Sequence, residues 1–204
     1  MEFYEVLNSR RTVREWSDEA VGEDVLERIL DAGLKAPSNN HMRQWEFIVL
    51  HTDEEKECAL QYVKERAAVQ AANLHLPENT PEQKMYAYAL PRQYSMLRDA
   101  PYVIIPLFRA NEALFKATAV NGLNPFASVW CVIENLFLAA SAEGLACSLR
   151  IPVGPEGADV CRTLGVPEAY MMACYIGIGH PAEEAEEPEQ YICTAKERIH
   201  KGRW

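Results

Sequence analysis

Residues 126–151 read FASVWCVIENLFLAASAEGLACSLRI and carry the strongest structural signal in the chain. Residues 126–143 are apolar around nearly the whole circumference of a helix, and Gly144 is a favourable place for that helix to end. The β-forming run at 147–151 follows at once and predicts a strand. The helix is too short and too interrupted by polar residues to cross a bilayer, so protein must cover it. Either it is the central helix of the domain, or it is buried in part against a second subunit.

Helices and strands alternate along the rest of the chain. Apolar residues at helical spacing predict helices at 2–9, 23–35, 54–72 and 156–164. Apolar β-forming runs predict further strands at 45–50, 102–108 and 170–178. Pro106 suggests that its strand lies at a sheet edge or contains a bulge. The fold class is therefore α+β, with about four strands and more helix than sheet.

Composition places the chain among ordinary globular proteins. Its 204 residues fit a single domain, 1–204, in which residues 180–204 form an extended C-terminal arm. The net charge of −10 repels nucleic-acid phosphates and anionic lipid, so neither nucleic acid nor membrane is expected as a partner. The six cysteines form no C-x-x-C pair, which argues against a disulfide framework or a metal site. With no apolar signal segment at the N-terminus, we expect a cytoplasmic protein.

A basic cluster stands out against this acidic background. Arg10, Arg11, Thr12 and Arg14 place three guanidinium forks and a hydroxyl within five residues. Guanidinium groups match phosphate geometry, so the cluster suits a small phosphorylated ligand. In a helical turn, Arg10 and Arg14 would share one face. The alternative is a solvated basic turn that pairs with the acidic residues following it.

Two polar segments flank the predicted strands. Pro37, Ser38, Asn39 and Asn40 end a helix just before the buried strand at 45–50, and their polar groups could hydrogen-bond the edge of a heteroaromatic ring. The turn at 143–146 leads into the strand at 147–151, whose edge could present backbone N–H groups to a ligand. Taken singly, each segment is better explained as an ordinary helix stop or turn.

In combination, these motifs resemble the nitroreductase family of FMN-dependent oxidoreductases. The resemblance rests on R-R-T-V-R at 10–14, A-P-S at 36–38 followed by Trp45, E-N-L at 134–136, E-G-L at 143–145 and G-I-G-H-P at 177–181. It covers nearly the whole chain, and its specificity lies in the order and spacing of the motifs. It implies a three-layer α/β/α sandwich with a mostly antiparallel sheet of about four to five strands, assembled as a domain-swapped homodimer with two FMN sites.

The resemblance also assigns residues to the cofactor. Arg10, Arg11, Thr12 and Arg14 would hold the phosphate and ribityl chain of FMN. The backbone at Leu149, Arg150 and Ile151 would supply an N–H to flavin N5. Residues that would reach the isoalloxazine from the other subunit are Pro37, Ser38, Asn39 and Asn40. Lys196 and Arg198 are the candidates for the basic residues that the family places near its C-terminus.

The chain departs from the family where the substrate would bind. The family commonly has Gln-Pro directly before the tryptophan, whereas this chain has Arg43-Gln44. Arg43 therefore becomes a candidate for the substrate pocket. Residues 75–125 match no family landmark, and we expect them, with Asn124 among them, to shape the substrate pocket or a lid.

The function that the resemblance implies is reduction of a small-molecule electron acceptor. NAD(P)H would reduce FMN and leave, and a nitroaromatic, quinone or similar acceptor would take its place in a ping-pong cycle. No protein catalytic residue is assigned, because the flavin carries the chemistry. The alternatives are a non-enzymatic FMN-binding storage or sensor protein and a specialised flavin reductase of the same fold.

Overall fold

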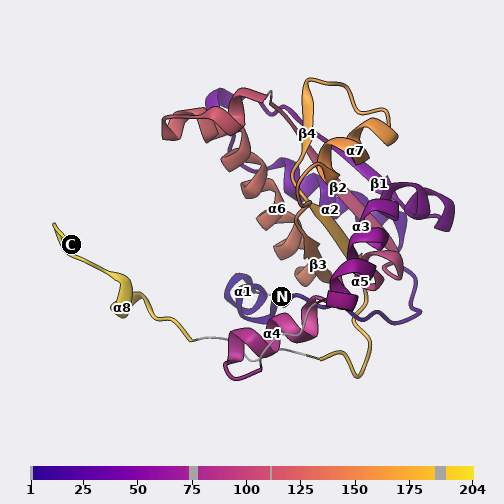
Figure 1. Ribbon diagram of the computed structural model, residues 1–204. Coiled ribbons are helices and arrows are strands. Elements are labelled where there is room, and N and C mark those ends of the chain that lie inside the picture. Colours follow the sequence, from indigo (N-terminus) through magenta and orange to yellow (C-terminus); the bar gives the residue numbers. More distant parts are fainter. Residues whose placement is uncertain (1, 74–77, 111, 187–191) are drawn as a thin grey trace.

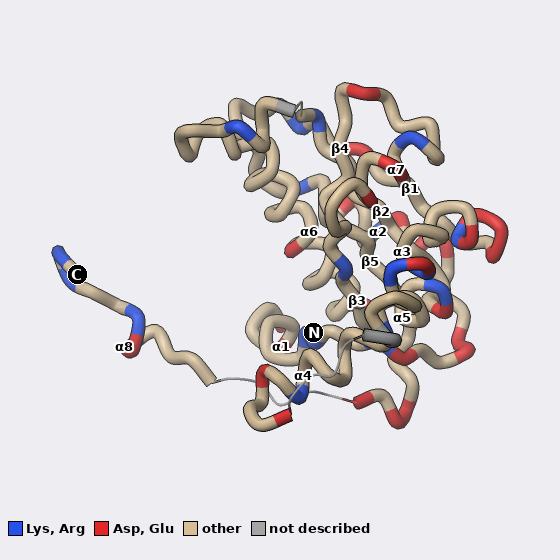
Figure 2. Tube along the Cα trace, in the orientation of Figure 1, with Lys and Arg blue, Asp and Glu red and all other residues tan. Residues whose placement is uncertain are grey.

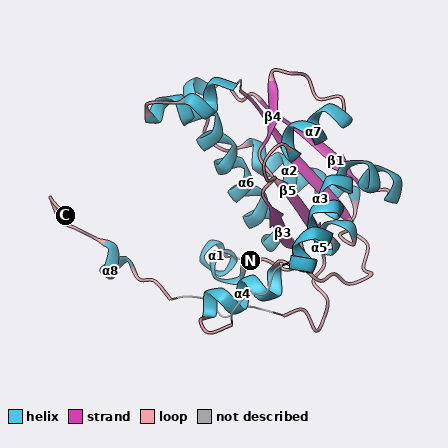
Figure 3. Cartoon of the chain, in the orientation of Figure 1, coloured by secondary structure: helices cyan, strands magenta, loops and turns pink. Residues whose placement is uncertain are grey.

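The computed structural model describes residues 2–73, 78–110, 112–186 and 192–204, and it shows one sheet between two helical layers (Figures 1 and 3). The strands are β1 Trp45–Leu50, β2 Tyr102–Arg109, β3 Ala146–Arg150, β4 Tyr170–Met172 and β5 Tyr175–Gly179. The α-helices are α1 Phe3–Ser9, α2 Glu23–Leu34, α3 Asp53–Asn73, α4 Pro81–Ala89, α5 Ser95–Arg98, α6 Asn124–Ala142, α7 Glu156–Thr163 and α8 Ala195–Arg198. Short 3₁₀ turns are η1 Asn39–His41, η2 Glu112–Lys116 and η3 Val120–Leu123.

The five-stranded sheet has the order β1-β2-β5-β3, with β4 also paired to β2, and every strand pair is antiparallel. Side chains along β2 alternate between two cores, as the period of a strand requires. Tyr102, Ile104 and Phe108 pack with residues of α2 and α6, whereas Val103, Ile105 and Leu107 pack with residues of α3, α5 and α7. The expected three-layer α/β/α sandwich is therefore confirmed.

Helix α6 contributes one face to the core and leaves another uncovered. Its buried side includes Val129, Val132, Ile133 and Leu136, and Leu136 approaches Gly33 of α2 so closely that a β-carbon on the glycine would lie 2.6 Å from it. Within residues 120–142, an 18-residue window has a mean hydropathy of 1.4, so by length and composition this is the one helix among the described residues that could span a membrane. The expectation that it is too short and too polar to do so is wrong. Its packing against β2 and α2 nevertheless identifies it as a core helix with one open face.

Pro106 does not place β2 at the edge of the sheet, so that alternative is wrong, but the other alternative, a bulge, is found in the ladder at Pro106. Between the pairs Ile104–Ile176 and Leu107–Met172, two residues of β2 face three residues of the partner strands. Pro106 pairs in register with Phe47 of β1, and its carbonyl accepts a hydrogen bond from the Ala173 N–H at 2.9 Å. The missing proline N–H faces the same side as that carbonyl, at the point where the sequence passes from β4 to β5. The single strand expected at 170–178 is in fact two strands, β4 and β5, so the hydrogen-bond ladder along β2 is interrupted between them. A proline, which has no N–H to donate, costs little stability at such an interruption.

Candidate functional site

The basic N-terminal segment is extended rather than helical, contrary to the geometry considered for Arg10 and Arg14. Thr12 forms a parallel bridge with Cys147 of β3, and the Val13 N–H donates to the Cys147 carbonyl at 3.0 Å. Alternate side chains of an extended segment lie on one side, which still groups Arg10, Thr12 and Arg14. The segment thus adds a short strand-like edge to β3. Figure 2 shows basic residues at this place, between α1 and β3.

The arginines of this segment have different environments. Arg11 donates from Nη1 to the carbonyls of Asn8 at 2.6 Å and Arg10 at 2.8 Å, so it closes the C-terminal end of α1. Arg14 is half-buried, and its Nε is shielded from solvent without a hydrogen-bond partner among the described residues. Burial lowers the pKa of Arg14 below its ordinary value, although an arginine stays charged at neutral pH. Arg14 is therefore a desolvated cation with a spare donor.

A second arginine, Arg92, lies close to Arg14. Arg92, just after α4, lies with Cζ 4.0 Å from the centroid of the Tyr88 ring, and Arg14 lies 5.8 Å from the same centroid. Neighbouring positive charge helps to lower the pKa of Arg14. Two guanidinium groups on one aromatic ring favour an anion between or beside them.

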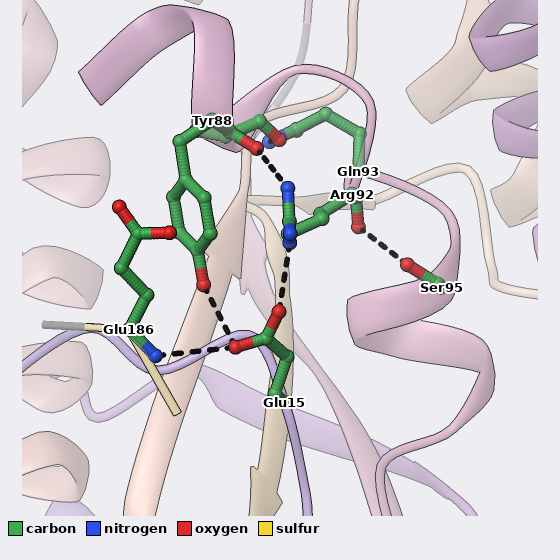
Figure 4. A network of polar contacts seen from close by, with 7 residues as sticks. Glu15, Tyr88, Arg92, Gln93, Ser95 and Glu186 are labelled. Carbon is green, nitrogen blue, oxygen red and sulfur yellow. Dashed lines mark hydrogen bonds and ion pairs between the residues drawn. The ribbon is translucent and has the colours of Figure 1, made fainter. Parts of the chain in front are cut away.

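Glu15 is the hub that fixes this arrangement (Figure 4). Its carboxylate accepts from Arg92 Nε at 2.9 Å, from the Tyr88 hydroxyl at 3.0 Å and from the Glu186 N–H at 3.2 Å. It therefore joins the basic segment to the end of α4 and to the start of the C-terminal arm. The hydrogen bond from Arg92 is the largest cause that holds the pKa of Glu15 below its usual value.

The Cys147 thiol beside this segment is not a nucleophile at neutral pH. Burial raises its pKa to about 12, and the nearby charge of Arg10 opposes that rise only in part.

The predicted ring-binding segment lies at the N-terminal end of α6 and has an unusual backbone. Asn40, His41 and Arg43 have φ angles of 50°, 54° and 46°, a left-handed region that side chains other than glycine rarely occupy. The Ser38 hydroxyl accepts from the Arg43 N–H at 3.1 Å. Strained residues of this kind persist where the surroundings fix them, and they cluster at ligand sites.

Helix α6 holds this segment in place. The Asn39 N–H donates to the Ser128 hydroxyl at 3.1 Å, and Asn124 Nδ2 donates to Asn39 Oδ1 at 3.2 Å. The predicted substrate residue Asn124 is thus in contact with the predicted ring-binding residue Asn39. Pro37 is exposed at the start of the segment.

A cavity of about 190 Å³ opens beside this segment. Trp45, Phe108 and Pro125 supply apolar wall, and Ser38, Asn39 and Asn40 line it with polar groups. The predicted Arg43 lies on it, and so does Arg109, the last residue of β2.

The remaining predicted residues lie elsewhere. Arg150 is buried, its guanidinium paired with both oxygens of Glu156 and its Cζ 5.6 Å from the Tyr175 ring centroid, so its side chain is not available to a substrate. Leu149 is half-buried and Ile151 exposed, and a backbone N–H from this strand to flavin N5 stays a prediction. Lys196 and Arg198 lie on α8, which Figure 1 shows away from the sheet and beyond α4.

The two halves of the predicted cofactor site do not meet within one chain. Residues 37–43 contact Asn124 and Ser128 at the start of α6, whereas Thr12 and Val13 contact Cys147, five residues after α6 ends at Ala142. At 1.5 Å per residue, Ser128 and Ala142 are separated by roughly 21 Å along the helix. The two groups of predicted cofactor residues therefore lie at opposite ends of α6 within one chain.

Sequence reasoning missed Tyr88, Arg92 and Arg109. All three lie in 75–125, where no motif matched, and only the fold brings Tyr88 and Arg92 beside Arg14. Arg109 had one detectable signal, since it is a lone arginine that ends a buried apolar strand. The described helices of residues 75–125 lie in two places: α4 and α5 lie beside the basic segment, while η2 and η3 adjoin the start of α6 (Figure 1). Strand β2 separates the two groups in sequence and lies inside the sheet.

The comparisons with known proteins agree with this architecture. The model of the nitroreductase family matches residues 7–180. The chain belongs to the nitroreductase family. The iodotyrosine deiodinase of Haliscomenobacter hydrossis is 26% identical over 188 residues, which cover 92% of this chain and 83% of the relative.

Two solved structures show the same fold. A mutant of the FMN- and NADPH-dependent nitroreductase NfnB, derived from sphigopyxis sp. strain HMH, superposes with a TM-score of 0.75 at 20% identity, covering 99% of this chain and 100% of the other. Oxidized iodotyrosine deiodinase bound to FMN and 3-iodo-L-tyrosine superposes with a TM-score of 0.72 at 16% identity, covering 95% and 97%. Family members are generally oxidoreductases, and these two neighbours are described with FMN.

Proposed function

We propose that this protein is an FMN-dependent oxidoreductase that takes hydride from NAD(P)H by a ping-pong mechanism and reduces a small organic acceptor such as a nitroaromatic or a quinone. The observation that carries the proposal is Arg14, a half-buried cation with an orphaned Nε donor beside a second arginine. A buried donor without a partner is costly, and a phosphate oxygen would satisfy it. The residues present therefore fit the phosphate end of FMN.

In this proposal Arg10, Thr12 and Arg14 hold the phosphate and ribityl chain, while Arg11 supports them by closing α1. Residues 38–40 approach the edge of the flavin ring. Bound FMN would supply hydride acceptance and two-electron transfer to the acceptor. The polypeptide would orient the ring, exclude water and place positive charge near the reduced ring.

We further propose that each site is shared by two subunits of a homodimer. The phosphate-binding and ring-binding residues lie at opposite ends of α6, so each end needs the complementary end of another chain. An uncovered apolar surface is available for this contact: Phe126 is 39% exposed, Cys131 is exposed, and Phe3 and Tyr4 of α1 are 62% and 76% exposed. Family members are typically homodimers, which supports this arrangement. The C-terminal arm, with exposed Ile199 and Trp204, would pack on the partner.

A specialised flavin reductase is the second candidate. The 26% identity to iodotyrosine deiodinase over 92% of the chain favours it, because that relative's name describes removal of a ring substituent rather than reduction of a nitro group. The two candidates are separated by comparing the rates at which the dithionite-reduced protein converts 3-iodotyrosine and a nitroaromatic.

The test of the main proposal is the visible spectrum of the purified protein after incubation with FMN, followed by anaerobic addition of NADH and then NADPH. We expect a bound-flavin spectrum that bleaches with one donor or both and recovers when an acceptor is added. A flavin spectrum that neither donor bleaches would instead support a storage or sensor protein. Failure to bind FMN would contradict both.

A further inference from the structure

The cavity at the N-terminal end of α6 carries an unusual charge for this protein. Arg43 and Arg109 both lie on it, and neither side chain has an ion pair or a hydrogen bond among the residues that the structure describes. The backbone alone is engaged, since the Arg43 N–H donates to Ser38 and the Arg109 N–H donates to the Gln44 carbonyl at 3.0 Å. In a chain of net charge −10, two unpaired arginines on one cavity form a local positive site.

The walls of the cavity limit what it can hold. Trp45, Phe108 and Pro125 suit a flat apolar ring. The volume of about 190 Å³ is below the ~300–1,000 Å³ that is usual for drug-sized ligands, so it fits a single ring with a small substituent. Guanidinium forks select carboxylate among such substituents, because they can donate two parallel hydrogen bonds to it.

The backbone of Arg43 is held in an unusual conformation next to the predicted ring-binding segment. Its φ of 46° is strained for an arginine, and the hydrogen bond to Ser38 holds it there. The same serine belongs to the segment that we expect to approach the flavin ring. A substrate held by Arg43 would therefore lie near the edge of the flavin ring.

We propose that Arg43 and Arg109 make this enzyme selective for aromatic acceptors that carry a carboxylate. This inference rests on the proposed function, because it names the substrate class of that site. The carboxylate binds the two guanidinium groups, the aromatic ring lies against the apolar wall, and the reducible group is directed to the flavin.

The test uses FMN-incubated protein and two matched probes, benzoate and the neutral isostere benzamide. Their dissociation constants are measured by calorimetry, which needs neither NAD(P)H nor turnover. The variants are Arg43→Gln and Arg109→Gln, which remove charge but keep hydrogen-bonding capacity. Arg162→Gln is the matched control, because Arg162 is exposed on α7 and pairs with Asp159 outside this cavity.

We expect the wild type and R162Q to bind benzoate at least roughly tenfold more tightly than benzamide, the size expected for one hydrogen bond to a charged group. R43Q and R109Q should each lose most of that preference while their benzamide affinity stays within about twofold. No preference in the wild type, no benzoate binding, or an equal loss of both probes in the variants would overturn the proposal.

A turnover measurement separates this proposal from the proposed function. With NAD(P)H, kcat/KM for 4-nitrobenzoate should exceed that for 4-nitrobenzamide, and R43Q should reduce the ratio mainly through KM. Benzoate selectivity without any flavin reduction would leave the anion site standing and contradict the reductase. Reduction of both nitro compounds at equal kcat/KM would support the reductase and overturn the anion site.

Discussion

The two ends of α6 are built by different physical means. At the C-terminal end, the basic segment is fixed by a strand-like bridge to β3 and by the charge network of Glu15, Tyr88 and Arg92. At the N-terminal end, residues 38–43 are fixed by left-handed backbone and by neutral hydrogen bonds to α6. A charged network suits the recognition of a phosphate, whereas a strained loop can bring small polar groups close to a flat ring. Because the two ends lie far apart along α6, we propose that each is completed by a second chain.

The largest effect is expected from a change that separates the subunits. Cys131→Asp places a charge on the open face of α6, where a partner would bury it. Because an unpaired buried charge costs several kcal/mol, we expect a monomer whose FMN affinity falls by ~100-fold or more. Sedimentation measures the oligomeric state, and flavin fluorescence measures the FMN affinity. Cys58→Asp is the control, since Cys58 is exposed on α3. A C131D dimer with normal FMN affinity would remove the case for a shared site.

The next effect isolates the phosphate-binding end. Arg14→Gln removes the orphaned donor and its charge, so FMN affinity should fall by about 10–100-fold. Riboflavin, which keeps the ribityl chain but lacks the phosphate, should lose much less affinity than FMN. Arg11→Gln should have a smaller effect, because Arg11 hydrogen-bonds the end of α1. Equal weakening of FMN and riboflavin by R14Q would mean that Arg14 does not bind the phosphate.

A smaller change probes the strained end. His41→Gly relieves a left-handed residue, which should raise the free energy of unfolding by about 1 kcal/mol. Acceptor kcat/KM should fall several-fold because the loop is less fixed. Asn40→Gly should stabilise less, since asparagine tolerates this conformation. Chemical denaturation measures the stability and steady-state kinetics measures kcat/KM. If H41G were less stable than the wild type, His41 would not be strained.

The smallest effect concerns the Glu15 network and pH. The folded-state pKa of Glu15 is depressed, so its contribution to stability is present above its ordinary value of 4.5 and is lost as pH falls through the folded pKa. Because the carboxylate is about one-third exposed, we expect Glu15→Gln to cost only about 0.5 kcal/mol at pH 7, and the difference to vanish as pH falls below the folded-state pKa of Glu15. Denaturant titrations at several pH values measure it. A pH-independent difference would show that the carboxylate's charge is not involved.

Much of the fold could be predicted from local sequence. Long apolar runs with clear stops predicted most helices and strands, because periodicity and turn residues act locally. The central position of Pro106 could not be predicted, since it depends on a break between β4 and β5 far along the chain. The division of the expected strand at 170–178 could not be predicted either, because β4 and β5 lie in one continuous apolar run of sequence.

The candidate site divides in the same way. The basic cluster at 10–14 and the polar turn at 37–40 are visible as motifs. The different environments of Arg11 and Arg14 cannot be seen in the sequence, because they depend on α1, on Tyr88 and on burial. The pairing of the Arg150 guanidinium with Glu156 on α7 is likewise not visible in the sequence, and the predicted backbone N–H at this strand stays a prediction.

Subunit complementation tests the shared site most directly. Arg14→Gln damages the phosphate end, and Ser38→Trp fills the ring end, so each homodimer should have little reductase activity. If the two residues at one flavin come from different chains, a mixed dimer contains one intact site, and a 1:1 mixture should recover about a quarter of wild-type activity. If both residues serve one flavin within a chain, every site in the mixture is damaged. No recovery, with mixed dimers verified by native mass spectrometry, would contradict this account.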